Sequence, residues 1–308
     1  MRVLESINSA LNQFLSGNKN AYFIGEDILD PYGGAFKVSR GLSEKHPRQV
    51  ITTPISEAGI VGISTGLAIK GYPVCVEIMF GDFLTLAADQ IINHMAKLPW
   101  VYAGQITVPV VIRTPMGGRR GYGATHSQSL EKHFCGVPGL TVVAISQFSD
   151  INEIYSTAFN SFSPHLIIEN KTLYPKEMEL NPYANVSGAE IALVSYGGCV
   201  EDCVRAAGFL LDQEEVVAKV VEVNTLSPLD REAVKNAVGE SRNVLVVEEG
   251  SEGWGFASEI SHALVSQRSI RFASLSAPNH PIPSAKSWES RVLPNADSII
   301  KSALELIR

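Results

Sequence analysis

A short strand that passes into a helix is predicted within the stretch Gln49-Val-Ile-Thr-Thr-Pro-Ile-Ser-Glu-Ala-Gly-Ile-Val-Gly62. Its first residues form an apolar, β-branched run, and Pro54 ends that run because proline cannot donate a backbone hydrogen bond. Glu57 then stands in the first turn of a glycine-rich helix, where the helix dipole favours an ionised carboxylate. The acid is therefore open to two interpretations at this point: it stabilises the start of the helix, or it belongs to a functional site.

The same alternation of apolar runs and helical patterns continues on both sides of this stretch. Strands are predicted at 22–24, 49–52, 73–77, 109–113, 140–144 and 165–169, helices at 57–70 and 150–159, and an amphipathic stretch at 83–97. A second series has strands at 191–195, 216–223 and 244–248 and helices at 200–211, 230–238 and 256–265. Such alternation indicates mainly parallel sheets covered by helices. The chain therefore has the α/β fold class, with two doubly wound domains.

Length and composition agree with two folded domains. The chain has 308 residues, about twice the usual size of one domain, and the polar, proline-containing segment 174–188 suits a linker. We place the domains at residues 1–180 and 181–308. The first residues predict an amphipathic helix with Leu4, Ile7, Leu11 and Leu15 on one stripe.

Charge and cysteine content exclude several classes of function. A formal net charge of -7 argues against nucleic acid or an anionic membrane as the main partner, because both require a concentrated positive face. No run approaches the roughly 18 apolar residues of a membrane span, and no apolar core of the signal-peptide kind begins the chain. Four cysteines are too few for a disulfide scaffold. We expect a cytoplasmic protein, or a matrix protein if a targeting segment has been removed.

A second informative segment runs from Arg113 to Glu131 and contains four glycines and His126. Such a loop can approach a ligand closely, and loops of this kind often carry functional residues. His126 is expected where the loop enters the next helix. There it can be either a structural cap or a residue of a binding site.

Five groups of residues together resemble a known family. They are Tyr22-Phe-Ile-Gly-Glu-Asp27, Tyr32-Gly-Gly-Ala-Phe-Lys-Val-Ser-Arg-Gly41, Thr53-Pro-Ile-Ser-Glu57, Glu77-Ile-Met-Phe-Gly-Asp-Phe83 with Asp89-Gln-Ile-Ile-Asn93, and Thr125-His-Ser-Gln-Ser-Leu-Glu131. The chain closely resembles the β subunits of the E1 components of 2-oxo acid dehydrogenases, such as the pyruvate, branched-chain and acetoin enzymes. The resemblance implies a transketolase-like pyrimidine-binding domain followed by a smaller transketolase C-terminal-type domain.

That resemblance implies an oxidoreductase that uses thiamine diphosphate. Glu57 matches the family carboxylate that hydrogen-bonds N1′ of the cofactor's pyrimidine and stabilises the tautomer needed for catalysis. Ile55, Met79 and Phe83 match apolar positions around the pyrimidine, although each is also a plausible core residue. His126 matches the family histidine at the mouth of the site, where it assists proton transfer or positions the substrate carboxylate or the lipoyl group.

Other residues of the resemblance concern the substrate and bound ions. Arg113, Arg119 and Arg120 are weaker candidates for attracting an anionic 2-oxo acid. The chain has no Gly-Asp-Gly motif of the kind that holds Mg²⁺ against the diphosphate, so no metal ligand is assigned in this chain. Some family members hold a potassium ion near positions such as Thr107, Ser161 and Ser163. Serines stand here where a carboxylate or amide is common, which argues against that ion.

The missing motif makes a partner chain necessary for the site. The resemblance implies an E1 α subunit that supplies the Mg²⁺ half in an α2β2 heterotetramer, and an E2 protein that carries the lipoyl group. Two other functions stay open: the C-terminal subunit of a split transketolase acting on sugar phosphates, and a non-catalytic scaffold with the same fold. The sequence does not specify which 2-oxo acid is used.

Overall fold

Seven strands form the larger of two sheets, in the order β2-β1-β3-β4-β6-β5-β9, and all but the last are parallel. The computed structural model describes residues 1–265 and 270–308. The strands of this sheet are β1 (Tyr22–Gly25), β2 (Val50–Thr52), β3 (Val74–Glu77), β4 (Val110–Met116), β5 (Thr141–Ile145), β6 (His165–Asn170) and β9 (Thr225–Ser227). The helices of this domain are α1 (Val3–Gly17), α2 (Leu42–Lys45), α3 (Glu57–Ile69), α4 (Leu98–Val101) and α5 (Ile151–Phe159).

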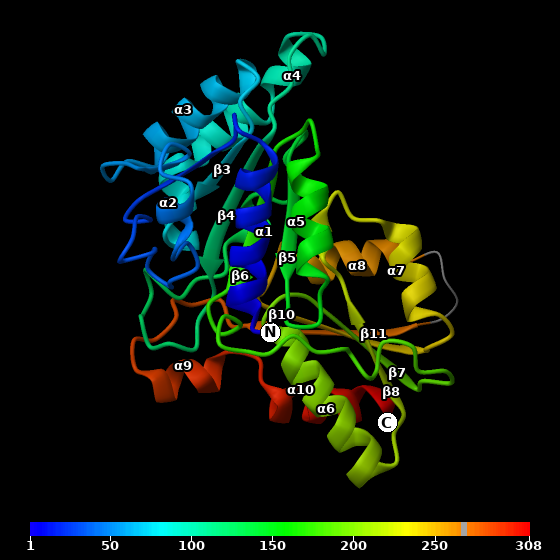
Figure 1. Cartoon of the computed structure of the whole chain (residues 1–308). Helices are drawn as coiled ribbons and strands as arrows, with labels where there is room; N and C mark the ends of the chain where they lie inside the picture. Colours follow the sequence, from blue (N-terminus) through cyan, green and yellow to red (C-terminus); the bar gives the residue numbers. More distant parts are fainter. Residues whose placement is uncertain (266–269) are drawn as a thin grey trace.

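Helices cover both faces of this sheet. α1 and α5 lie side by side on one face (Figure 1), where Phe14 and Phe159 stack with ring centroids 4.0 Å apart. On the other face lie α3, a 3-10 segment, η1 (Gly81–Ala87), and a π-helical segment, η2 (Gln90–Met95). Val111 packs on the α1 side and Ile112 on the α3 side, as the alternation of side chains along a strand requires. A strand covered on both faces is apolar throughout, which is why 109–113 predicts a buried strand.

A four-stranded parallel sheet in the order β11-β10-β7-β8 forms the second domain. Its strands are β7 (Ile191–Ser195), β8 (Ala218–Glu222), β10 (Asn243–Ser251) and β11 (Arg271–Ala277). Its helices are α6 (Cys199–Glu214), α7 (Arg231–Val238), α8 (Phe256–Leu264), α9 (Lys286–Val292) and α10 (Ala296–Ile307). α6 and α10 pack together on one face, at the bottom of Figure 1, with α7 and α8 on the other.

The two domains share one apolar cluster. Val142 and Ala144 of β5 belong to the same group of buried residues as Val194 of β7 and Val246 of β10. In addition β9, which follows β8 in the chain, pairs antiparallel with β5 of the first domain. The second domain is therefore fixed against the first by both packing and a strand of its own.

The predicted α/β class, the mainly parallel sheets and the amphipathic helix at the start of the chain are confirmed. Other details differ. The amphipathic stretch 83–97 folds as parts of η1 and η2. No α-helix receives His126, because the next helical turn is the 3-10 turn η3 (Glu131–His133). Strands β9 and β11 and helices α2, α4, α9 and α10 have no counterpart in the prediction. No helix within 1–265 and 270–308 is long and apolar enough to cross a membrane.

The topology explains where a site can form. The chain goes from β1 to β2 on one side and returns to β3 on the other, so the strand order reverses at β1. Ligands of such sheets bind at the carboxyl ends of the strands beside this reversal. Glu26 follows β1, Glu57 follows β2, Met79 follows β3, and the loop with His126 follows β4. All residues predicted for the site therefore leave the sheet at the same edge.

Candidate active site

Two carboxylates stand together at the switch point. Glu57 is the first residue of α3 and is buried, and Glu26, directly after β1, is buried beside it. The Ser56 amide donates to Glu26 Oε1 at 3.2 Å, which ties the start of α3 to the end of β1. Burial raises the pKa of Glu26, and the negative charge of Glu57 raises it further. In the described part of the chain the Glu57 carboxylate makes no hydrogen bond or ion pair, so it is free to bind a ligand.

His126 lies in an aromatic corner. Its ring meets Phe80 and Phe83 edge to face, with centroids 5.0 Å and 5.3 Å away. Thr125 Oγ1 lies 3.0 Å from His126 Nδ1. The structure thus brings together His126 and Phe83, two of the predicted residues, and adds Phe80, which sequence reasoning left without a role.

The predicted apolar positions differ in exposure. Ile55 is 81% exposed just before α3, so the alternative that it is a core residue is wrong for this chain. Met79 and Phe83 are half-buried on the segment that leaves β3. Ile55 therefore lies on the surface of this chain, two residues before the buried Glu57.

Two glycines with positive φ let the backbone of the histidine loop approach its neighbours closely. Gly117 has a φ of +89°, and a Cβ there would lie 2.4 Å from Asn170 Nδ2. Gly123 has a φ of +79°, and its Cβ would lie 2.6 Å from Ser284 Oγ. Glycine is the residue that fits both positions. The loop is thus held against β6 on one side and against the segment before α9 on the other.

The prediction that Arg113 attracts the substrate is wrong. It is 1% exposed on β4, and its Nε donates to Glu169 Oε1 at 2.7 Å. Its other nitrogens donate to Glu77, to the second oxygen of Glu169 and to Tyr174. A guanidinium whose nitrogens all serve buried partners cannot also receive a ligand. Arg113 holds β3, β4 and β6 together below the site.

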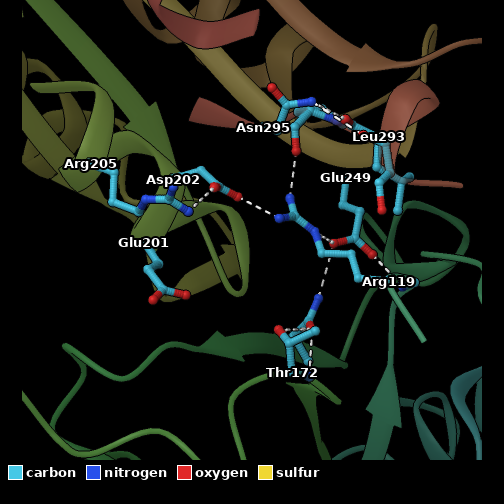
Figure 2. Close-up of polar contacts among 12 residues, drawn as sticks. Arg119, Thr172, Glu201, Asp202, Arg205, Glu249, Leu293 and Asn295 are labelled. Carbon is cyan, nitrogen blue, oxygen red and sulfur yellow. Dashed lines mark hydrogen bonds and ion pairs between the residues drawn. The ribbon is translucent and has the colours of Figure 1, made fainter. Parts of the chain in front are cut away.

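Arg119 joins the histidine loop to the second domain. Figure 2 shows its guanidinium between Asp202 of α6 and Glu249 of β10, at 2.6 Å and 3.7 Å, and it also donates to the carbonyl of Pro294. Burial lowers the pKa of Arg119, but the carboxylates of Glu249 and Asp202 outweigh this effect and raise the pKa. Arg119 is therefore occupied by the domain contact. Arg120 is exposed and donates to the Lys171 carbonyl at 2.7 Å.

A cavity in the described structure lies away from the predicted site residues. It has a volume of about 710 Å³ and lies between η3 and the second domain, with Tyr196, Arg231 and Trp254 in its wall. None of the predicted site residues lines it. Among the described residues no group of three or more His, Cys, Asp or Glu side chains could hold a metal ion. Thr107 and Ser163 lie exposed on adjoining segments, joined by a hydrogen bond from Val108 N to the Phe162 carbonyl. The expectation that this chain lacks the potassium ion of some family members stays a prediction.

Known proteins resemble both halves of the chain. Residues 1–177 match the transketolase pyrimidine-binding domain family, and residues 183–299 match the transketolase C-terminal domain family. The pyruvate dehydrogenase E1 component subunit beta-2 of Oryza sativa is 32% identical, over 98% of this chain and 85% of its own. The β subunit of acetoin:2,6-dichlorophenolindophenol oxidoreductase from Cupriavidus necator is also 32% identical, over 98% and 96%. This chain belongs to the E1 β-subunit family.

A solved structure shows the same fold as this E1 β subunit. It is a split-gene transketolase, described as an inactive β4 tetramer, and it matches with a TM-score of 0.76 at 19% identity over 99% of this chain and 98% of its own. At that identity the likeness concerns the fold alone. The roles of Glu57 and His126 therefore stay predictions.

Two residues of this E1 β subunit were missed from the sequence. Glu26 has a signal that could have been used, because it comes shortly after the predicted strand 22–24 and the carboxyl ends of parallel strands are where ligands bind. Lys171 has none: a lysine in a sequence normally indicates a surface residue, yet its side chain here is completely buried. Only the tertiary structure places it beneath the histidine loop.

Proposed function

We propose that this E1 β subunit belongs to a thiamine-diphosphate-dependent 2-oxo acid dehydrogenase. Together with an α subunit it would decarboxylate a 2-oxo acid and transfer the acyl group to lipoamide on an E2 protein. The observation that supports this proposal most directly is Glu57. The residue is buried at the switch point of the sheet, and its carboxylate has no partner within the described chain. Ligands of such sheets bind at this edge, so a carboxylate that has no protein partner there is expected to bind a ligand.

The residues present fit the pyrimidine half of the cofactor. Glu57 would hold a proton at the pyrimidine nitrogen N1′. Glu26, whose pKa is raised by burial and by the charge of Glu57, places a second carboxyl group at the same edge. Ile55, Met79 and Phe83 offer apolar surface for the ring and would exclude water. Bound thiamine diphosphate would supply the electron sink for loss of CO₂ from the 2-oxo acid.

His126 would act on the substrate side of the site. Its Nδ1 lies beside the Thr125 hydroxyl, and its ring orientation is fixed by Phe80 and Phe83. A ring held in this way can move a proton to or from the substrate, or position the substrate carboxylate. Arg120 is the arginine of the loop that stays exposed and could draw the anionic substrate toward it.

An α subunit is supported by the surface around Glu57. Ile63 on α3 is 62% exposed, Leu86 in η1, which packs against α3, is 60% exposed, and Ile55 just before α3 is exposed as well. Exposed apolar side chains that gather around a polar site indicate an interface with another chain. We propose that the partner covers this face, completes an α2β2 heterotetramer and supplies the Mg²⁺ ligands. We also propose a cytoplasmic location, which the four free cysteines favour.

The first experiment measures thiamine diphosphate binding by calorimetry. The chain is purified with its α partner and Mg²⁺, and binding is followed by an assay of 2-oxo acid decarboxylation and acyl transfer to a lipoyl domain. Glu57→Gln should keep the fold and most of the binding but reduce turnover by at least roughly 100-fold, the scale of a lost proton-transfer group. Glu153→Gln is the matched control, because Glu153 is an exposed first-turn acid of α5.

The outcomes separate the alternatives. Cofactor binding that requires both chains, with turnover lost only in Glu57→Gln, supports the dehydrogenase. Turnover of sugar phosphates and not of 2-oxo acids would instead favour the split transketolase. A complex that binds no cofactor would make the chain a scaffold and overturn the proposal.

A further inference from the structure

Lys171 is a buried cation directly after β6. Its side chain is completely buried, and it forms no ion pair with a carboxylate in the described chain. Its ammonium donates instead to the backbone carbonyl of His126. An ammonium in such a place is unfavourable unless it is hydrogen-bonded, so the contact with the carbonyl is a requirement of the fold there.

The ammonium and the histidine ring share one aromatic neighbour, Phe80. Lys171 Nζ lies 5.3 Å from the centre of the Phe80 ring and 5.8 Å from that of Tyr122, and Phe80 packs against His126. Three carboxylates, Asp82, Glu249 and Glu289, act on it from η1, β10 and α9, and Arg120 opposes them. Burial lowers the pKa of Lys171 to about 8, so the amine is mainly charged at neutral pH.

The hydrogen bonds of the loop show what Lys171 does. The first part of the loop is anchored by Glu249, which accepts from Gly118 N, and by Glu289, which accepts from Gly121 N at 2.7 Å. The last part is anchored by Asp82, which accepts from the backbone and the side chain of Gln128. Between them, residues 122–126 receive one hydrogen bond from outside the loop within the described structure, and it comes from Lys171.

We propose that Lys171 is a positioning residue that fixes His126 for the reaction by holding its backbone carbonyl from beneath. The aromatic rings set the orientation of the imidazole, and Lys171 sets the position of its backbone. This inference deepens the proposed function and rests on it, since His126 has its role there. Lys171 itself does not reach the substrate, because its side chain is closed off from solvent.

Hydrogen exchange of the full chain, measured by mass spectrometry at pH 7, tests the proposal without any assay of activity. Lys171→Met removes the donor at similar volume, and Lys171→Arg keeps a charged donor. The Met variant should exchange peptides covering 122–130 roughly ten- to hundred-fold faster, the scale of a lost hydrogen bond to a charged group. The Arg variant should restore much of the protection. Lys176→Met is the control, since Lys176 pairs with Glu201 at a half-exposed site.

Two results of the exchange experiment would overturn the proposal. One is unchanged exchange of 122–130 in Lys171→Met. The other is faster exchange that extends equally to α6 (Cys199–Glu214), which would mean that Lys171 supports the whole fold.

Kinetics of the complex with the α subunit form the second arm. A residue that positions His126 without touching substrate should lower kcat by at least roughly tenfold while KM for the 2-oxo acid stays within about threefold. A higher KM at unchanged kcat would overturn the positioning role. If the wild-type complex has no activity, the proposed function fails, but the exchange experiment still decides whether Lys171 fixes the loop.

Discussion

Removal of the Arg119 side chain should weaken the contact between the histidine loop and the second domain. Arg119 connects three places of that domain, through Asp202, Glu249 and the Pro294 carbonyl (Figure 2). Both carboxylates are nearly fully buried, whereas the arginine side chain is 24% exposed. Loss of one partner of a buried ion pair leaves the other charge poorly compensated and typically costs about 3 to 5 kcal/mol.

The structure places the cost toward the lower end of that range. After Arg119→Met, Glu249 still accepts hydrogen bonds from Gly118 N and Asn170, and Asp202 still has Arg205 at 3.6 Å. We therefore expect a loss of about 3 kcal/mol in the free energy of unfolding. Arg119 also has a φ of +70°. Arg119→Gly should consequently lose about 1 kcal/mol less than Arg119→Met, because glycine adopts that backbone conformation without strain.

Urea unfolding of the full chain measures these differences. The shared apolar core predicts a single transition for the wild type. A double-mutant cycle with Asp202→Asn should give a coupling energy of about 1 to 3 kcal/mol, as for residues in direct contact. A loss below about 0.5 kcal/mol for Arg119→Met, the range of ordinary surface substitutions, would refute the view that Arg119 ties the domains together.

Three further predictions follow from burial and exposure. Burial raises the pKa of Glu131 to about 7, so between pH 4.5 and 7 the folded state keeps a proton that the unfolded state has released. The free energy of unfolding should therefore fall between pH 5 and 7 by up to about 1.4 kcal/mol per pH unit. Urea titrations across this range should show a smaller dependence on pH for Glu131→Gln. Leu11→Ala should cost about 2 to 5 kcal/mol in the same assay, since Leu11 is completely buried between α1 and the sheet. Ile63→Lys should prevent co-purification with the α subunit without lowering the melting temperature, whereas Leu180→Lys, at another highly exposed aliphatic residue, should leave assembly intact.

Local chemistry made most of the fold predictable from the sequence. Strand β3 has a proline before it and a fully buried apolar run, and β7 begins and ends where the prediction placed it. Strand β11 was missed because it reads Arg-Phe-Ala-Ser-Leu-Ser-Ala and its residues are mostly half-buried or exposed, as an edge strand allows. Strand β9 is three residues long and pairs with the other domain, so its signal lies in tertiary structure.

The candidate site was predictable where a strand and a helix meet, and less so inside the loop. Glu57 stands at the first turn of α3 because Pro54 ends the preceding strand. His126 was expected at the start of a helix, but glycines with positive φ keep the segment in turns, and Lys171 and the aromatic rings hold it instead. Arg113 was assigned wrongly for the same reason. Its position beside a glycine-rich loop suggested an anion-binding residue, whereas carboxylates from two neighbouring strands pair with its guanidinium in the fold.

Buried polar groups without hydrogen-bond partners indicate where a ligand or another chain is expected to bind. Buried polar atoms are nearly always hydrogen-bonded in folded proteins. In the described part of the chain, the hydroxyls of Thr53, Ser64 and Ser127, one carboxylate oxygen each of Asp82 (Oδ2) and Glu289 (Oε1), Gln147 Oε1 and Arg119 Nε are buried without a hydrogen-bond partner. The interior network of Arg113, by contrast, is satisfied at every nitrogen. Most of these atoms lie on the segments that carry Glu57 and His126 or pack against them, as the proposed site, shared with a cofactor and a second chain, requires.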